Sequence, residues 1–147
     1  MKALLTRSLT LRALAVLALI IVGEIANGTV RTLFITPRVG DLAARQIGTV
    51  SGSVLILLVA WVCSPWLRAS SRRAQWAVGL LWVVLMMAFE VAFGRLVAGV
   101  SWARLAADYN LARGGLLGLG MAWLLCAPSL AHTIRQKRAW PGRNLVE

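Results

Sequence analysis

The sequence predicts an all-α integral membrane protein with four transmembrane helices. Hydrophobic residues make up 59% of its 147 positions, and charged residues only 14%. The charges lie mainly between four long apolar runs, which is typical of a chain that crosses a bilayer several times. A soluble domain of this size would expose enough apolar surface to aggregate, and the same composition excludes a disordered chain.

Each apolar run is long enough to cross the membrane as a helix. A spanning helix needs roughly 20 mostly apolar residues, and in lipid only helices and closed barrels satisfy their backbone groups internally. The four runs are residues 13–35, 47–67, 76–97 and 112–131. We expect the runs to pair into two successive helical hairpins, at residues 1–68 and 69–132. A basic cytoplasmic tail, residues 133–147, should follow them.

The distribution of lysine and arginine predicts the orientation. Three of these residues precede or begin the first run, three lie between the second and third runs and four lie in the tail, ten in all, against six near the other two connections. Positive residues are retained on the cytoplasmic side, so both termini should be cytoplasmic. A high content of leucine, alanine and glycine, together with more arginine than lysine, is typical of proteins from GC-rich bacteria. We therefore expect a bacterial inner membrane.

A cleaved signal peptide is the alternative for the first run. Lys2, Arg7 and Arg12 precede an apolar segment, as in such peptides. No small-x-small cleavage site follows that segment, however, and hydrophobic residues continue to Phe34. We therefore expect the first run to be retained as a transmembrane helix.

The two halves of the chain resemble each other in residue order. Three pairs recur at a constant offset of 66 positions: Glu24 and Glu90, Gly28 and Gly94, Arg38 and Arg104. An aspartate and then an Ala-Arg pair follow in both halves, with a register slip of one or two residues. This pattern favours duplication of a helical hairpin, with a pseudo-symmetry axis along the membrane normal. The alternative is chance similarity in a chain rich in leucine, alanine and glycine.

Both outer connections carry signals for a short amphipathic helix. Thr36 and Pro37 form a cap followed by proline, and Ser101 can cap a second segment. Asp41 and Arg45 are spaced for an i,i+4 ion pair. We expect these segments to lie in the membrane interface; the alternative is that they are ordinary solvated connections.

The residue inventory excludes most catalytic and metal chemistry. His132 is the single histidine, and Cys63 and Cys126 are the only cysteines. These residues cannot form a haem, di-iron or zinc site from this chain alone, and no phosphate-binding loop or nucleophile motif is present. We expect no cofactor, no metal and no catalytic residues. The cysteines should be packing residues, each followed by a proline that ends or kinks its helix.

Two glutamates lie within the apolar runs and define the candidate site. An acidic side chain at the bilayer centre costs about 3 kcal/mol, so Glu24 and Glu90 should be protonated or paired. Arg31 and Arg95 follow them, and pairing across the repeats would join Glu24 to Arg95 and Glu90 to Arg31. With Asn27, these residues predict a central polar pocket for a proton, a cation or a headgroup. The alternative is a buried network that locks two helices together or contacts another subunit.

Two glycines and one short string complete the sequence signals. Gly28 and Gly94 follow the glutamates by one turn and should let a neighbouring backbone approach closely. The string Glu24–Thr29 is similar to the first-helix glutamate region of small multidrug-resistance transporters, which also have four helices. The tandem repeat and the charged outer loops depart from that family, so the resemblance is confined to this string.

These features predict a small multi-pass transporter or an ion- or proton-handling protein that uses its intramembrane glutamates. The alternative is a non-catalytic accessory or assembly subunit of a larger membrane complex, and an enzyme acting on lipid or quinone ranks last. Expected partners are the bilayer itself, anionic headgroups at the basic inner face, and a second copy or another membrane subunit. No basic soluble domain is present, so we expect no nucleic-acid partner.

Overall fold

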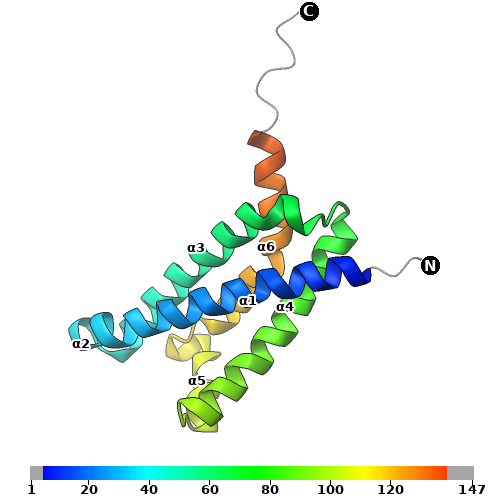
Figure 1. The fold of residues 1–147 in the computed structure, drawn as a ribbon. Helices are drawn as coiled ribbons and strands as arrows, with labels where there is room; N and C mark the ends of the chain where they lie inside the picture. Colours follow the sequence, from blue (N-terminus) through cyan, green and yellow to red (C-terminus); the bar gives the residue numbers. More distant parts are fainter. Residues whose placement is uncertain (1–4, 139–147) are drawn as a thin grey trace, which may run out of the picture.

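The computed structural model describes residues 5–138, and within that range the chain is helical without strands. Four long helices dominate Figure 1: α1 Arg7–Val30, α3 Asp41–Leu67, α4 Arg72–Ala92 and α6 Leu117–Arg138. Alone or with the turns that continue them, all four are long and apolar enough to cross a membrane. This confirms the all-α fold and the four predicted helices, although their ends differ by several residues from the predicted bounds.

Short helical segments continue or connect the long helices. The π-helix η1 Arg31–Ile35 and the turn α2 Thr36–Val39 extend α1 without a break. The π-helix η2 Phe93–Val97 extends α4 in the same way. A short helix, α5 Trp102–Asp108, and a 3₁₀ turn, η3 Leu111–Arg113, then lead to α6.

The first outer connection differs from the separate amphipathic helix expected there. Thr36 does not cap a new helix, and its Oγ1 instead donates to the Arg31 carbonyl at 3.1 Å. Pro37 lacks an N–H for the preceding turn, and the helix widens into η1 just before it. Gly40, at φ 80°, then reverses the chain so that α3 begins at Asp41. In the second connection Ser101 does cap α5, accepting from the Arg104 amide at 3.2 Å.

The helices pack tightly at the end of the bundle that holds the start of α1 and the α3–α4 connection, here termed the closed end. The fully buried Trp82 of α4 donates from Nε1 to the Ala13 carbonyl of α1 at 2.8 Å. Gly79 of α4 lies against the Leu125 carbonyl of α6, where any side chain would overlap the backbone. The Arg12 guanidinium lies 5.9 Å from the Trp66 ring centroid at this same end.

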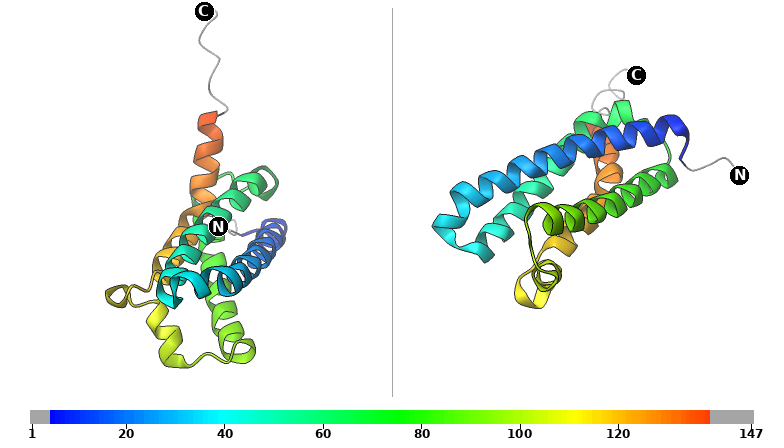
Figure 2. Two further views of the ribbon diagram at one scale, coloured as in Figure 1. Left: turned by 90° about the vertical axis from the view of Figure 1, so that its left-hand side faces the viewer. Right: turned by 60° about the horizontal axis from the view of Figure 1, so that its bottom comes forward.

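Beyond Trp82 the helices diverge. In Figures 1 and 2, α1 and α4 separate towards α2 and α5, so the bundle is wide at its opposite end, here termed the open end. α3 still packs against α1, and two of its buried positions, Gly48 and Gly52, lie against the side chains of Arg31 and Glu24. Small residues at helical spacing let two helices approach closely. The α1–α3 pair therefore forms one wall of the open end.

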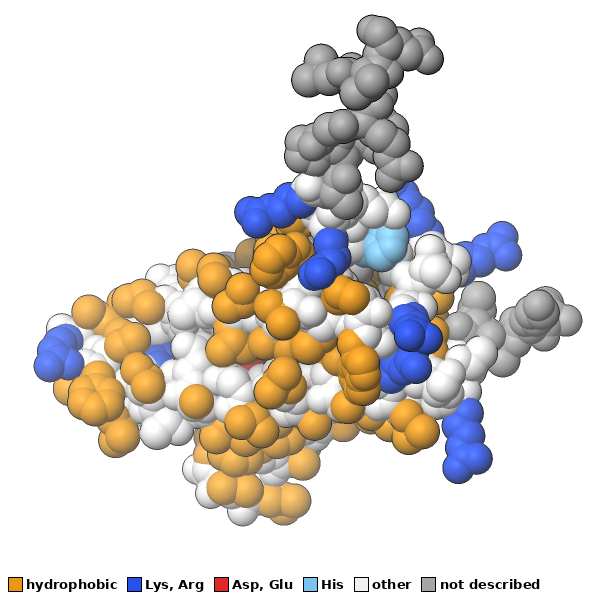
Figure 3. All heavy atoms as spheres, turned by 45° about the horizontal axis from the view of Figure 1, so that its top comes forward, with side chains coloured by type: hydrophobic (Ala, Val, Ile, Leu, Met, Phe, Trp, Pro, Cys, Tyr) orange, Lys and Arg blue, Asp and Glu red, His pale blue; other side chains and the backbone are white. Residues whose placement is uncertain are grey.

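The outer surface suits a bilayer. Only 22–28% of the most apolar stretch of each spanning helix is buried inside the chain, so most of its apolar side chains face outwards. Figure 3 shows hydrophobic side chains across the middle of one face and most of the visible Lys and Arg near the closed end. Such a distribution is typical of a multi-pass membrane protein.

The two helix prolines behave differently from each other. Pro65 lies two residues before α3 ends at Leu67, as predicted for a helix terminator. The Trp61 carbonyl accepts from Ser64 Oγ at 3.0 Å and Arg135 Nη1 at 3.3 Å, which compensates for the N–H that proline lacks. Pro128 does not end its helix, because α6 continues to Arg138.

Candidate functional site

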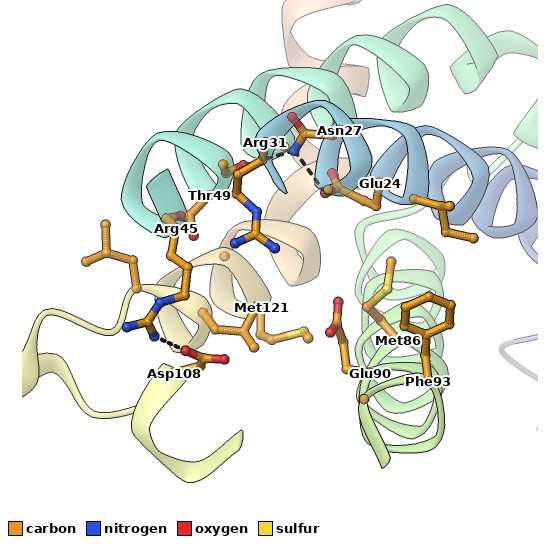
Figure 4. Close-up of a pocket in the computed structure, with 18 of the residues that line it drawn as sticks. Glu24, Asn27, Arg31, Arg45, Thr49, Met86, Glu90, Phe93, Asp108 and Met121 are labelled. Atoms are coloured by element: carbon orange, nitrogen blue, oxygen red, sulfur yellow. Dashed lines mark hydrogen bonds and ion pairs between the residues drawn. The ribbon is translucent and has the colours of Figure 1, made fainter. Parts of the chain in front are cut away.

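A cavity of about 570 Å³ occupies the open end, with α1 and α3 on one side and α4, α5 and α6 on the other. Four of the five predicted pocket residues line it: Glu24 and Asn27 of α1, Arg31 at the start of η1, and Glu90 of α4. Figure 4 shows Glu24 and Arg31 pointing into this space from one wall and Glu90 from the opposite wall. Two acids that are 66 residues apart in the sequence therefore face one cavity.

Asn27 links Glu24 to the backbone of α3. Its Nδ2 donates to Glu24 Oε2 at 3.4 Å and to the Gly48 carbonyl at 3.0 Å, while its Oδ1 accepts from Ser51 Oγ at 2.8 Å. Glu24 Oε1 is shielded from solvent and has no hydrogen-bond partner among the described residues. The carboxyl is thus held in place on one side and left with free bonding capacity on the other.

Two glycines of α3 provide the space that the polar residues of α1 occupy. A Cβ on Gly52 would lie 2.7 Å from both Glu24 carboxyl oxygens, and one on Gly48 would lie 2.6 Å from Arg31 Cδ. Neither glycine was among the predicted site residues. Their Gly-x-x-x-Gly spacing within an apolar run is the signal that could have identified this contact face.

The predicted ion pairs across the repeats do not form. Within residues 5–138, neither Glu24 nor Glu90 has an ion pair with an arginine. Glu90 lies half-buried on the α4 wall of the cavity. Arg31 points into the same cavity, and its guanidinium has no ion pair or hydrogen bond within the described part of the chain. Both glutamates and Arg31 are therefore available to a bound species.

Arg95 does not belong to the pocket. Its Nη1 donates to the Val100 carbonyl at 2.6 Å, and its guanidinium lies 5.0 Å from the Trp102 ring centroid. Arg95 lies in η2, five residues after Glu90, and this spacing is not a whole number of helical turns, so the two side chains lie on different faces. It stabilises the connection between η2 and α5.

The two predicted packing glycines have different surroundings. A Cβ on Gly28 would meet nothing within 4 Å, so Gly28 lines the cavity and does not bring another helix close. A Cβ on Gly94 would lie 2.9 Å from Leu105 Cδ2. Gly94 therefore accommodates a side chain of α5, whereas the sequence predicted close approach of a backbone.

A network of four charged residues, here termed the α3–α5 clasp, joins these two helices at the open end. Arg45 contacts Asp41 through Nε at 3.2 Å and also forms an ion pair with Asp108. Arg104 Nη2 lies 2.6 Å from Asp41 Oδ2. The sequence predicted the Asp41–Arg45 pair from local spacing. The contacts with Arg104 and Asp108 each join residues 63 positions apart, so only the tertiary structure reveals them.

The sole tyrosine of the chain lies beside this clasp. Tyr109 follows Asp108, and its hydroxyl is shielded from solvent without a hydrogen-bond partner among residues 5–138. Burial, and then the nearby negative charges of Glu90 and Asp108, raise the pKa of Tyr109 above its ordinary value. The tyrosine therefore reports on the electrostatics at the edge of the cavity.

The chemistry available to this site is proton exchange and charge recognition. Three acids and three arginines line the cavity: Glu24, Glu90, Asp108, Arg31, Arg45 and Arg104. Among the described residues, no group of three histidine, cysteine, aspartate or glutamate side chains lies close enough together to hold a metal.

Comparisons of this chain with protein-family models, with curated proteins and with solved structures give no match.

Proposed function

We propose that this chain is a small multi-pass membrane transporter that moves a proton or a small charged solute, with Glu24 and Glu90 as its ionisable groups. The observation that carries the proposal is that these acids, on α1 and α4, face one cavity while Glu24 Oε1 lacks a partner. Ionisable residues within membrane spans mark ion and substrate pathways, because charges there are costly unless they are used.

The proposed setting is a bacterial inner membrane with both termini in the cytoplasm. The start of α1, the α3–α4 connection and the end of α6 lie towards one end of the bundle, as four passes require (Figure 1). Most lysines and arginines belong to these segments, where anionic headgroups would attract them. In this orientation the cavity opens towards the outer face.

An internal duplication remains part of the proposal. The residues that recur at an offset of 66 support it, as do the π-helical segments that extend both α1 and α4. The outer connections of the two proposed hairpins differ. The first turns at Gly40 alone, whereas the second contains α5 and η3. Divergence after duplication accounts for this difference.

A proton-flux measurement tests the proposal. The full-length protein would be reconstituted in phosphatidylcholine–phosphatidylglycerol liposomes that contain a trapped pH dye, and a potassium diffusion potential would drive proton entry. We expect wild-type flux above that of empty liposomes, and loss of the excess flux in Glu24→Gln and Glu90→Gln. Asp41→Asn is the matched control, since Asp41 is exposed and does not line the cavity.

Two results would overturn proton transport by these glutamates. Wild-type flux equal to that of empty liposomes excludes proton movement, and unchanged flux in both glutamine variants excludes the glutamates. Failure of the variants to accumulate in the membrane, with wild-type flux absent, would instead indicate a structural network.

Apart from the cavity, an apolar groove favours the alternative function of an accessory subunit. This groove, of about 650 Å³, lies between α3 and α6 and includes Val54, Trp61 and Trp123. An apolar groove on the outer surface fits a helix of another membrane protein. Native mass measurement after mild-detergent extraction separates the two functions, because an accessory subunit would be recovered in a fixed ratio with other chains and a transporter alone or as a homo-oligomer.

A further inference from the structure

We propose that the cavity binds the headgroup of an amine-bearing phospholipid, which enters sideways from the bilayer between α1 and α4. This inference deepens the proposed function, because it assigns a ligand class to the same cavity. The headgroup would occupy the polar interior, and the acyl chains would extend outwards between the two helices.

The shape of the open end provides the lateral entrance. α1 and α4 are joined by the hydrogen bond from Trp82 to the Ala13 carbonyl and diverge beyond it (Figures 1 and 2). On the α1 side the cavity is lined by Ile25 and Leu33, which are 42% and 62% exposed. On the α4 side Phe93, 38% exposed, also lines it. Acyl chains can lie along these apolar side chains without breaking any polar contact.

The charges of the interior select a ligand with two opposite charges. Arg31 is a cation that points into the cavity and lacks a partner within the described chain. Glu24 and Glu90 face the same space from opposite walls (Figure 4). A phosphate bound to Arg31 forms charge-assisted hydrogen bonds with the guanidinium fork. An ammonium group deeper in the cavity can then donate to the two carboxylates.

Ligands with a single charge match this arrangement less well. A small cation would pair with the glutamates but would provide no hydrogen-bond acceptor for the Arg31 guanidinium. A free phosphate would pair with Arg31 but would place negative charge near Glu24 and Glu90. Acyl chains alone would leave all three groups unsatisfied in an apolar medium, which is the most costly outcome. A phosphate and an ammonium on one short link satisfy both walls.

The chemistry also distinguishes between lipid headgroups. The primary ammonium of phosphatidylethanolamine has three N–H donors for the carboxylates. The trimethylammonium of phosphatidylcholine has none, and phosphatidylglycerol has no cation. The wild-type protein should therefore prefer phosphatidylethanolamine over the other two, a selectivity that can be measured without any mutation.

Native mass spectrometry of the full-length protein, titrated with each lipid in turn, tests the proposal. We expect phosphatidylethanolamine to bind at least fivefold more tightly than phosphatidylcholine or phosphatidylglycerol. Glu90→Gln should remove that preference, whereas Arg31→Gln removes a contact with the phosphate that all three lipids share and should weaken the binding of all three. Arg38→Gln is the matched control for Arg31→Gln, because Arg38 contacts the Phe34 carbonyl and does not line the cavity. Equal affinities for the three lipids, an unchanged preference in Glu90→Gln, or unchanged affinities in Arg31→Gln would overturn the proposal.

A competition experiment identifies the source of the headgroup. Soluble glycerophosphoethanolamine carries the same phosphate and ammonium without acyl chains. We expect it not to displace bound phosphatidylethanolamine at millimolar concentration, because the lateral site also uses the chains. Displacement at that concentration would overturn lateral entry and assign a water-soluble ligand. The two proposals can fail independently. Lipid binding is measured without a gradient, so it can be absent while proton flux persists. Proton flux is measured in liposomes without phosphatidylethanolamine, so it can be absent while lipid binding persists.

Discussion

Gly52 of α3 and Glu24 of α1 are in such close contact that a Cβ carbon at position 52 would lie 2.7 Å from both carboxyl oxygens. The Glu24 carboxyl therefore occupies a notch that exists only because α3 has no side chain at this point. One turn earlier, Gly48 gives the same space to the Arg31 side chain. The polar residues of α1 are thus positioned by the absence of side chains on α3.

This relationship predicts opposite effects for two glycine-to-alanine substitutions. Gly52→Ala should destabilise the protein by about 1–3 kcal/mol, since the carboxyl must move out of a tightly packed contact. Gly28→Ala should be neutral or stabilising by up to about 1 kcal/mol, because its Cβ meets open space within a helix. Thermal unfolding in detergent, followed with a thiol-reactive dye that reports exposure of the half-buried Cys63 and Cys126, measures both effects. A loss of stability in Gly28→Ala equal to that in Gly52→Ala would contradict the packing described here.

The α3–α5 clasp predicts unequal contributions from its two aspartates. Asp108 and Arg45 have only 24% and 21% of their side chains exposed, so Asp108→Asn leaves a half-buried arginine poorly compensated. We expect a loss of about 1–3 kcal/mol for this variant. Asp41, at 48% exposed, is screened by solvent, and Asp41→Asn should cost less than about 1 kcal/mol. Equal melting temperatures for the two variants would show that the Arg45–Asp108 contact does not stabilise the fold.

The charge-exchanged double variant is the control for that pair. Arg45→Asp combined with Asp108→Arg keeps both charges and reverses their positions. If the contact itself matters, the double variant should be more stable than the sum of the two single substitutions implies. Additive losses would assign the effect to the individual side chains.

Tyr109 predicts an alkaline transition that can be observed directly. Burial and the neighbouring Glu90 and Asp108 raise its pKa, so the folded protein should ionise this hydroxyl above the ordinary value of about 10. The unfolded chain ionises first, and stability should therefore decline as the pH rises through and beyond about 10. Because Tyr109 is the only tyrosine, phenolate absorbance reports its titration without interference from others. Tyr109→Phe should lack both the absorbance change and this part of the alkaline loss, and a titration at or below the ordinary value would contradict the buried environment.

The helices and the main acidic residues of the site could be predicted from the sequence for a physical reason. Spanning the hydrocarbon demands long apolar runs, and an acid such as Glu24 within a run is conspicuous because it is costly. Hydrophobicity does not, however, determine which faces meet. The contacts of Arg45 with Asp108 and of Arg104 with Asp41 depend on how α3 and α5 are placed relative to each other, and local spacing carries no information about that.

Two of the incorrect expectations concern which helix face a residue occupies. The sequence predicts Arg95 in the pocket because it follows Glu90 closely, but its side chain lies on another face and contacts Val100 and Trp102. The sequence predicts a packing role for Gly28 because small residues often mark helix contacts, yet a Cβ at this position would meet nothing within 4 Å. The glycines that do provide close contact, Gly48 and Gly52, lie on the facing helix. The space for the polar side chains of one helix is thus provided by small residues on the helix that it packs against.

The open surroundings of Gly28 provide a steric test of the cavity itself. Leucine at this position places four additional carbon atoms in the space between Glu24, Arg31 and the opposite wall without meeting another element at Cβ. Gly28→Leu should therefore change the free energy of unfolding by no more than about 1 kcal/mol. It should nevertheless abolish the excess proton flux and the phosphatidylethanolamine preference. Ala26→Leu is the matched control, since it adds similar bulk to an exposed position of the same helix that does not line the cavity. Wild-type flux and lipid selectivity in a folded Gly28→Leu protein would show that neither activity uses this cavity, whatever the roles of the two glutamates.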